Sequence, residues 1–310
     1  MGFDVPFIID WLRAGIRLAI PLITVSIGLL YTERSGVLNL GVEGMMLVGS
    51  FSAVAVAALT GSVIGGSICA MMVGLLLALA FAYLVINRRA DQVVAGFGIN
   101  VLSLGLTNTL GPYLLAERFR VSLFPTVGLG FLERVPILGP LLSDQPVVVW
   151  IALALVLASS WVLYRTSWGL NIRAVGEHPH AVAVCGLSVY KWRYIGILAG
   201  GAAAGLGGAV LALSDLGYFV PNMTAGRGFI VLAALAVGNW KPLPTAGICL
   251  LFGAADALQL RFQTFGSVIP HQILLMLPYV LTIAALAGFV GRTRLPKAYA
   301  TPYDPEEFSA

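Results

Sequence analysis

The 310-residue sequence has few charged side chains, since Lys, Arg, Asp and Glu together make up only 10% of it. Soluble globular proteins carry about 25% charged residues, so this composition excludes an ordinary soluble domain. The formal net charge of +4 is modest. It indicates basic cytoplasmic loops of a membrane protein rather than a surface that binds nucleic acid.

Cysteine is also scarce, and no metal-binding pattern is present. Cys69, Cys185 and Cys249 are widely spaced and stand mostly in apolar runs, so they form no disulfide framework and no CxxC site. They are expected to be small, buried apolar side chains. His178 and His180 are two residues apart, which on a helix points them in different directions. We therefore expect no metal on this chain.

The sequence lacks the common catalytic and nucleotide-binding motifs. It contains no GxxxxGK[ST] loop, no HExxH and no GxSxG, so we expect neither a P-loop nucleotide site nor an enzyme. Two carboxylates inside apolar runs, Glu43 and Asp256, are isolated, whereas a proton-coupled carrier usually has more ionisable groups along its spans. We expect no cofactor on this chain, so energy from ATP would have to enter through another subunit.

Apolar residues are abundant instead: 59% of the chain is hydrophobic and the mean hydropathy is +0.93. A membrane-spanning helix needs about 20 mostly apolar residues. The predicted fold is an all-α polytopic membrane helix bundle of about 8–10 transmembrane segments, some of them broken. The candidate spans are 15–31, 36–60, 62–86, 92–113, 146–164, 194–214, 228–239, 243–261 and 271–290.

The whole chain, 1–310, is expected to form a single transmembrane domain. Residues 1–14 are predicted to form an interfacial N-terminal segment, residues 166–193 a cytoplasmic loop, and residues 292–310 a cytoplasmic tail. The basic residues favour this orientation under the positive-inside rule. The number of crossings, and therefore the side of the N-terminus, stays open.

Glu43 is the only charged residue between Ser35 and Asn87. A carboxylate inside a membrane segment is energetically costly and indicates a functional position. Glycines flank it on both sides, at positions 36, 41 and 44, which predicts a helix that starts or breaks within the bilayer. Transporters build their central sites from such broken helices.

A second short apolar run, 228–239, is too short to span a bilayer and ends at Gly238-Asn-Trp-Lys-Pro-Leu-Pro244, where two prolines prevent helix continuation. It opens on Gly226-Arg227-Gly228, with one charge held between glycines, as at Glu43. Two such breaks favour an inverted-repeat transporter core, with chance similarity as the alternative. We hypothesise that Glu43 pairs with Arg227 and holds two half-helices together.

Polar residues in the fourth span share one helical face, because Asn100, Ser103, Thr107 and Asn108 follow the helical period. Such a stripe binds the hydroxyls of a sugar or the edge of a base, or it makes hydrogen bonds between helices; both interpretations remain open. Glycines and Ala204 in the sixth span predict close helix packing. The residues predicted along a substrate pathway are Asn39, Glu43, Asn100, Ser103, Thr107, Asn108, Arg227, Asp256 and Gln259.

The cytoplasmic loop contains a short candidate helix within residues 176–186, which read GEHPHAVAVCG. Pro179 fits the first turn of a helix and Gly186 fits its C-terminal stop. The residues between them are mostly small, so the helix can lie deep in a partner's groove; an ordinary connecting loop is the alternative. The residues predicted to contact such a partner are Gly176, Glu177, His178, Pro179, Ala181, Ala183 and Gly186.

Several of these motifs resemble a known family. Residues 33–46 (ERSGVLNLGVEGMM), 89–96 (RADQVVAG) with Asn100, and 173–177 (RAVGE) through Gly186 are similar to permease subunits of ATP-binding cassette transporters of the ribose and branched-chain amino acid superfamily. Residues 257–263 (ALQLRFQ) and 277–282 (LPYVLT) are similar to its nucleoside-type members. The resemblance covers residues from about 20 to 291.

The resemblance implies a multi-pass protein of the bacterial inner membrane that acts in import. It implies a second, different permease subunit, ATPase subunits that hold ATP and magnesium, an extracytoplasmic substrate-binding protein, and residues 176–186 as the coupling segment. The expected function is uptake of nucleosides. The alternatives are the same kind of importer for a simple sugar or an amino acid, or a stand-alone secondary carrier.

Overall fold

The computed structural model describes residues 5–115, 120–128, 141–142, 144–264 and 295–304, and the isolated positions 276, 280, 283, 284 and 287. These residues are mostly helical. The strands among them are two short segments, β1 (Thr126–Val127) and β2 (Gln145–Pro146), which pair antiparallel with Thr126 opposite Pro146. The candidate span 271–290 lies largely outside the described residues.

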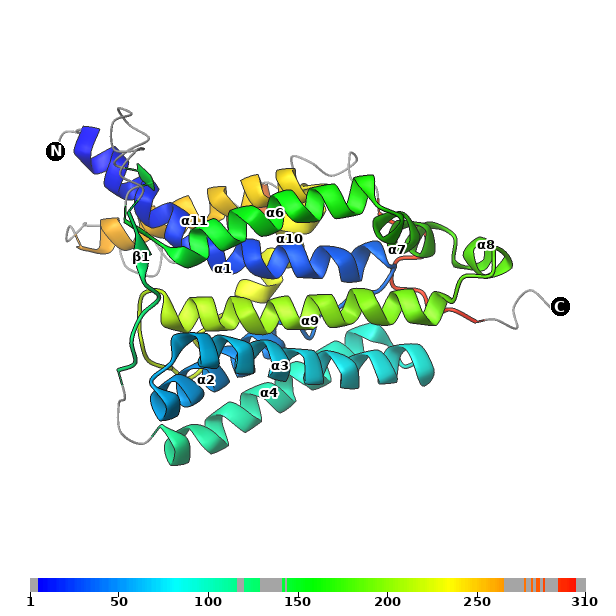
Figure 1. Cartoon of the computed structure of the whole chain (residues 1–310), viewed down its shortest axis with the longest axis horizontal. Helices are drawn as coiled ribbons and strands as arrows, with labels where there is room; N and C mark the ends of the chain where they lie inside the picture. The colour runs from blue at the N-terminus through cyan, green and yellow to red at the C-terminus, as the bar shows by residue number, and fades with distance from the viewer. Residues whose placement is uncertain are drawn as a thin grey trace.

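Seven helices of the described chain are long and apolar enough to cross a membrane. They lie side by side with their axes roughly aligned (Figure 1). The chain is therefore a polytopic helix bundle, as its composition predicts. The long helices are α1 (Val5–Arg34), α2 (Val42–Thr60), α3 (Val63–Ala82, extended by the π-helical turn η1, Tyr83–Asn87), α4 (Gln92–Leu114), α6 (Val147–Arg165), α9 (Val189–Leu213) and α11 (Pro242–Thr264).

Among the described residues, three further helices are short: α7 (Ser167–Glu177), α8 (Pro179–Val184) and α10 (Arg227–Val237). At 1.5 Å per residue, α10 extends over about 16 Å, roughly half of the bilayer's hydrocarbon core. The prediction of a half-helix in this region is confirmed. After α10 the chain turns through Asn239 and Trp240, both with positive φ, and α11 begins at Pro242.

The first two helices differ from the predicted spans. α1 is continuous from Val5, so the boundary expected at residue 14 is not a break in the helix. Its charged residues do not interrupt it because they have partners: Asp10 lies 3.8 Å from Arg261, and Arg13 lies 3.7 Å from Asp144. α2 begins only at Val42, several residues later than the predicted span that starts at 36.

α9 is the central helix and packs against α1, α2 and α3. Its glycines make this possible, because a Cβ atom at Gly205 would lie 2.0 Å from the carbonyl oxygen of Ala70 in α3. A Cβ atom at Gly208 would lie 2.0 Å from the carbonyl oxygen of Met46 in α2. The predicted close packing of this small-residue helix is confirmed, and the backbones of neighbouring helices are in direct contact.

The two ends of the bundle differ in charge. The start of α1, the strands and the end of α11 lie at one end, here called the outer end, while α7, α8 and residues 295–304 lie at the other, the coupling end (Figure 1). By the positive-inside rule we expect the coupling end to be cytoplasmic and the start of α1 to lie outside; this orientation stays a prediction. The basic residues of the coupling end are Arg34, Arg88, Arg89, Arg165, Arg173, Lys191, Arg193, Lys241 and Lys297.

Candidate functional site

The centre of the molecule contains a stretch of buried backbone that is not helical. α1 ends at Arg34, and residues 36–41 run back into the bundle before α2 starts. Gly36 turns the chain with φ of +88°, and Val37 and Asn39 are fully buried. Irregular backbone at membrane depth is tolerated only where protein groups satisfy its hydrogen bonds, so the neighbouring side chains determine whether this segment is stable.

α4 contributes three hydrogen bonds to this segment and to the first turn of α2 through two amide side chains. The Asn100 side chain spans the bend, because its Oδ1 accepts from the backbone N–H of Gly44 at 2.8 Å while its Nδ2 donates to the carbonyl of Leu40 at 2.9 Å. Gln92, in the first turn of α4, accepts from the backbone N–H of Leu38 at 2.7 Å. α4 thereby fixes the course of the chain into α2.

The predicted pathway residue Asn39 also acts on the backbone. Its side-chain oxygen accepts from the backbone N–H of Gly41 at 3.0 Å, which closes a local turn of the kind that Asn favours. Its amide nitrogen lies 3.7 Å from the sulfur of Met45. Asn39 is therefore a buried residue that shapes the break before α2.

Glu43 joins the starts of two helices. One of its carboxylate oxygens accepts from the backbone N–H of Gly226 at 2.8 Å and the other from the backbone N–H of Gly228 at 2.7 Å. These donors open α10, and Glu43 itself lies in the first turn of α2. The N-termini of two helices thus meet at one carboxylate that is 8% exposed, the kind of acceptor that the first N–H groups of a helix bind.

Glycine is required on the α10 side of this contact. A Cβ atom at Gly228 would lie 2.8 Å from the carboxylate oxygen of Glu43, and Gly226 has φ of +84°. On the other side, a Cβ atom at Gly44 would lie 2.6 Å from the hydroxyl of Ser103 in α4. We call Glu43, Asn100, Gly226, Gly228 and the segment 36–44 the Glu43 junction.

The hypothesis that Glu43 pairs with the Arg227 side chain is wrong. The Arg227 guanidinium lies 3.9 Å from the carboxylate of Asp256 in α11, and it donates to the carbonyl of Met223 at 3.1 Å. The half-helices are joined at Glu43, but through backbone amides. The physical reason is that the first N–H groups of a helix point along its axis while its side chains point outward.

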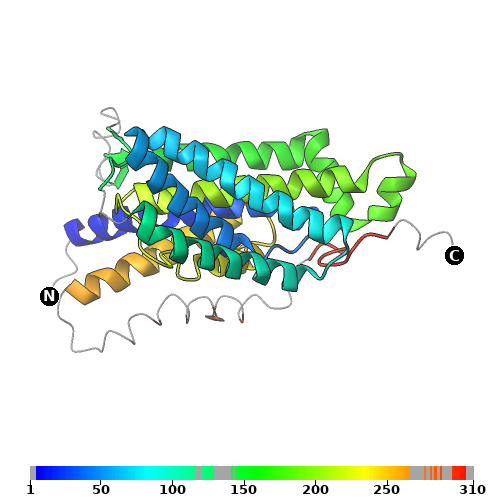
Figure 2. The same ribbon diagram turned by 90° about the horizontal axis from the view of Figure 1, so that it is seen from below.

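The polar stripe of α4 divides into three parts. Asn100 and the fully buried Ser103 lie at the Glu43 junction, and the Ser103 hydroxyl has no hydrogen-bond partner among the described residues. The Thr107 hydroxyl donates to the carbonyl of Ser103 in its own helix at 2.9 Å. Asn108 is exposed. Figure 1 shows α4 at the lower edge of the bundle, and Figure 2, seen from below, shows it in front of the other helices, so this exposed part of the stripe faces away from the helices of this chain.

A cavity of about 610 Å³ opens at the outer end, between α1, α9, α11 and the turn before α10. Arg227, the sequence neighbour of Gly226 and Gly228, belongs to its lining. Asp256 touches this lining through its ion pair with Arg227, and Gln259 is buried in the same helix. The charged residues that line the cavity are Asp10, Arg13, Arg17, Asp215, Arg227 and Arg261.

The predicted coupling segment has the expected local structure. Pro179 is the first residue of α8, and Gly186 follows the helix with φ of +81°. One side of α8 packs through Val182 on Ile172 and Trp192. The other side is open: Val184 is 87% exposed, and Ala181 and Gly186 are exposed as well. Figure 1 shows α8 projecting from the coupling end.

The described residues include no group of three or more His, Cys, Asp or Glu side chains that would hold a metal ion. His178 is exposed, and its ring nitrogen lies 3.5 Å from the ammonium group of Lys297. The ring of His180 lies 5.1 Å from that of Tyr303, between centroids, and is tilted by 50° to it. Both histidines therefore contact the C-terminal residues of the structure.

The sequence did not reveal a buried polar contact at the coupling end. Glu33, in the last turn of α1, is 1% exposed and accepts a hydrogen bond from the indole of Trp240. The next residue, Arg34, donates to the carbonyl of Trp240 at 2.8 Å and so satisfies the turn after α10. The only sequence signal was a Glu-Arg pair next to an apolar run, and that pattern is also typical of an exposed loop.

Comparison with known proteins finds a family model and relatives that are all described as permeases of transport systems. The family model described as "Branched-chain amino acid transport system / permease component" matches residues 12–286. The chain is 40% identical to the guanosine ABC transporter permease protein NupQ of Bacillus subtilis, over 92% of this chain and 93% of the relative. It is 35% identical to a putative glucose ABC transporter permease protein, TsgC13, of Haloferax volcanii, over 95% and 97% of the two chains.

Two further relatives bear on substrate and assembly. The chain is 33% identical to the nucleoside ABC transporter permease protein NupC of Lactococcus lactis, over 91% of this chain and 93% of the relative. It is also 27% identical, over 66% of this chain and 60% of the relative, to a second guanosine ABC transporter permease protein of Bacillus subtilis, NupP. Similarity thus extends to two differently named permeases of one organism.

Proposed function

The chain belongs to the family of permease components of the branched-chain amino acid transport systems, and from this premise we propose that it imports nucleosides. It is the permease subunit of an ATP-binding cassette importer and a multi-pass protein of the inner membrane. Its relatives are transporter permeases rather than enzymes. What carries the nucleoside assignment is 40% identity to a guanosine permease over 92% of this chain.

Glucose is the second candidate substrate, because a putative glucose permease is 35% identical over 95% of the chain. An exposed amide group such as that of Asn108 suits the ribose of a nucleoside and the hydroxyls of a sugar equally well. The two candidates differ in the base, so the experiment must separate base recognition from sugar recognition.

Uptake competition is the decisive measurement. Cells that carry the complete transporter take up labelled guanosine, and excess unlabelled uridine or adenosine is expected to reduce this uptake to near the background rate, because the competitor occupies the same site. Excess glucose or ribose is expected to leave it unchanged. Cells that lack this chain provide the background rate. If glucose reduced the uptake and the unlabelled nucleosides did not, the proposed substrate would be a sugar and not a nucleoside.

The proposed assembly contains a second permease subunit. α4 lies at the edge of the bundle and exposes large apolar side chains on most of its length, with Asn108 among them. Such a face suits a partner permease, and the two guanosine permeases NupQ and NupP, both similar to this chain, favour two different subunits. An extracytoplasmic binding protein would deliver substrate to the cavity at the outer end.

ATPase subunits, which would hold ATP and magnesium, are proposed to dock on α8 at the coupling end. The exposed residues of α8 are small or apolar, and its buried side is packed on α7 and the start of α9. Movement of α8 would therefore carry α7 with it. Tilting of the long helices around the Glu43 junction would then open the pathway alternately to each side.

Replacing Val184 by Arg is expected to prevent ATPase docking. Val184 is 87% exposed, so the long charged side chain leaves the fold of this chain intact but fills the space that a partner's groove would need. The ATPase subunits should no longer co-purify with the permease, and uptake should fall to background. The control is Val184→Ala, which keeps a small side chain and should bind ATPase normally. Co-purification of the Arg variant at the normal level would contradict docking on α8.

A further inference from the structure

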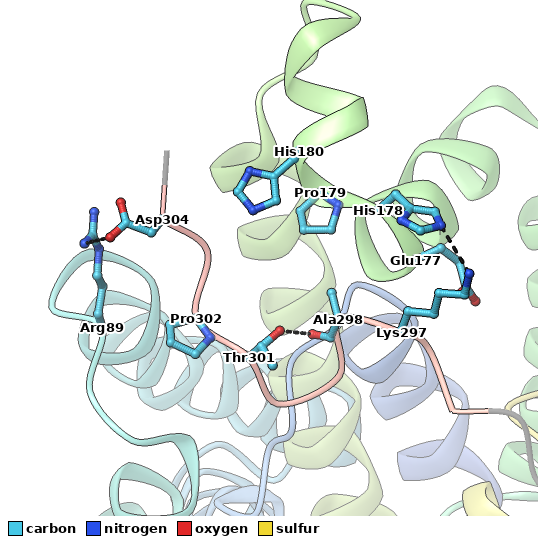
Figure 3. A pocket seen from close by; sticks show the side chains of 10 residues that line it. All are labelled: Arg89, Glu177, His178, Pro179, His180, Lys297, Ala298, Thr301, Pro302 and Asp304. Carbon is cyan, nitrogen blue, oxygen red and sulfur yellow. Dashed lines mark hydrogen bonds and ion pairs between the residues drawn. The ribbon is translucent and has the colours of Figure 1, made fainter. Parts of the chain in front are cut away.

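Residues 295–304, here called the strap, cross the coupling end and contact segments that are far apart in the sequence (Figures 1 and 3). The backbone N–H of Ala298 donates to the carbonyl of Gly176 at 2.9 Å, at the end of α7. The backbone N–H of Ala300 donates to the carbonyl of Gly36 at 3.0 Å, where the irregular segment begins. The strap therefore bridges the coupling segment and the Glu43 junction.

The three backbones meet without intervening side chains. A Cβ atom at Gly176 would lie 2.1 Å from the carbonyl oxygen of Arg34 and 3.1 Å from the nitrogen of Gly36. A Cβ atom at Gly36 would lie 3.0 Å from the carbonyl oxygen of Ala298. Van der Waals contact prevents Gly176 and Gly36 from moving closer together. The hydrogen bonds that Ala298 and Ala300 of the strap donate to these two residues oppose their moving apart.

Side chains fix the strap both between and beyond its two backbone hydrogen bonds. Between them, the ring of Tyr299 packs edge-on against Trp240, with centroids 6.0 Å apart, and it interacts with the buried carboxylate of Glu33. Burial, and then this carboxylate, raise the pKa of the Tyr299 hydroxyl above its ordinary value, so the hydroxyl keeps its proton and stays a donor. This contact ties the strap to α1 and to the turn after α10.

Downstream, the strap is held by charged and aromatic partners. Arg193, which is 2% exposed, donates to the carbonyl of Thr301 at 3.0 Å. The ring of Tyr303 lies 5.1 Å from that of His180 in α8. Asp304 and Arg89 form an ion pair at 2.6 Å, on the far side of the cavity of about 870 Å³ that Figure 3 shows. The strap is thus anchored at several points along its described length.

We propose that the strap is a positioning element that makes the coupling segment and the start of the irregular segment 36–41 move as one body. This inference rests on the proposed function, in which the ATPase acts on α8. Gly36 lies seven residues before Glu43, so a displacement passed through the strap reaches the point where α2 and α10 begin. The strap would then be needed for transport but not for assembly or for ATP hydrolysis.

Removing the strap tests this role in the complete transporter. A chain that ends after residue 294 is expected to co-purify with its partners and to keep basal ATP hydrolysis. Guanosine uptake should fall about tenfold or more, within the range of typical coupling free energies, and stimulation of hydrolysis by guanosine should disappear. The matched control ends after Asp304 and keeps every strap contact described above. Equal uptake by the two truncated chains would overturn the proposal.

A cross-link tests the same inference with the strap in place. Cysteines at positions 180 and 303, introduced in a Cys185→Ser background and joined by a short bifunctional thiosulfonate, would fasten the strap to α8. Uptake should continue, because segments that move together tolerate a link between them. If the cross-linked transporter lost uptake and regained it when a reducing agent cleaved the link, the proposal would be overturned. This test decides the question even if the chain that ends after residue 294 fails to assemble. Absence of guanosine uptake by the unmodified complex would instead refute the proposed function.

Discussion

Replacing Glu43 by Ala is expected to abolish uptake and to lower the thermal stability of the purified subunit. The substitution removes the acceptor of two backbone N–H groups at the start of α10. Each buried donor left without a partner costs about 1–3 kcal/mol, and the contact between the two half-helices is lost with them. Uptake of labelled guanosine and the midpoint of thermal unfolding in detergent are the measurements.

Two variants at the same position separate charge from shape. Glu43→Gln keeps the volume but offers one oxygen acceptor, and its NH₂ group faces a backbone donor, so an intermediate loss of stability and uptake is expected. Glu43→Asp keeps the charge but shortens the reach by one methylene group and should also be impaired. Wild-type uptake and stability in the Gln variant would contradict the role of Glu43 as a double acceptor.

Exchanging the charges of Glu43 and Arg227 gives a further expected outcome. The double variant Glu43→Arg with Arg227→Glu should not recover transport, because the partners of Glu43 are backbone amides and the ion pair of Arg227 is with Asp256. If the double variant took up more guanosine than both single variants, the prediction would be wrong, and a direct ion pair between Glu43 and Arg227 would explain the result.

The sequence predicted the elements that depend on local rules. The apolar runs marked the long helices, the glycines and prolines around α10 marked a half-helix, and Pro179 and Gly186 marked the ends of α8. Each of these follows from hydropathy or from the backbone preferences of one residue. The isolated carboxylate at position 43 likewise identified the centre of the structure, although not its hydrogen-bond donors.

The contacts that were missed join residues distant in the sequence and involve the backbone. Gly226 and Gly228 donate through N–H groups that every residue except proline has, so these glycines predict the break in the helix but not the acceptor of their N–H groups. The strap binds Gly176 and Gly36 in the same way. The inverted repeat remains a prediction, and so do the roles of the pathway residues and of residues 176–186. Substitutions that separate structural contact from substrate contact are therefore needed.

Asn100 and Asn108 offer such a comparison within one helix. Replacing Asn100 by Leu removes the acceptor of the Gly44 N–H and the donor to the Leu40 carbonyl, two hydrogen bonds worth about 0.5–1.5 kcal/mol each before the cost of the unpaired groups. The expected result is a lower unfolding temperature together with a large loss of uptake. Asn100→Asp should be similarly impaired, because its second oxygen would face the carbonyl of Leu40.

Asn108→Leu is the matched variant, two turns further along α4 and exposed. It breaks no hydrogen bond within the described chain, so the unfolding temperature should stay at the wild-type value. If Asn108 lines the pathway, the KM for guanosine uptake should rise about tenfold, the effect of one lost polar contact, while the amount of transporter in the membrane stays the same. An unchanged KM would show that Asn108 does not line the pathway. Wild-type stability of the Asn100→Leu variant would show that α4 does not hold the break before α2.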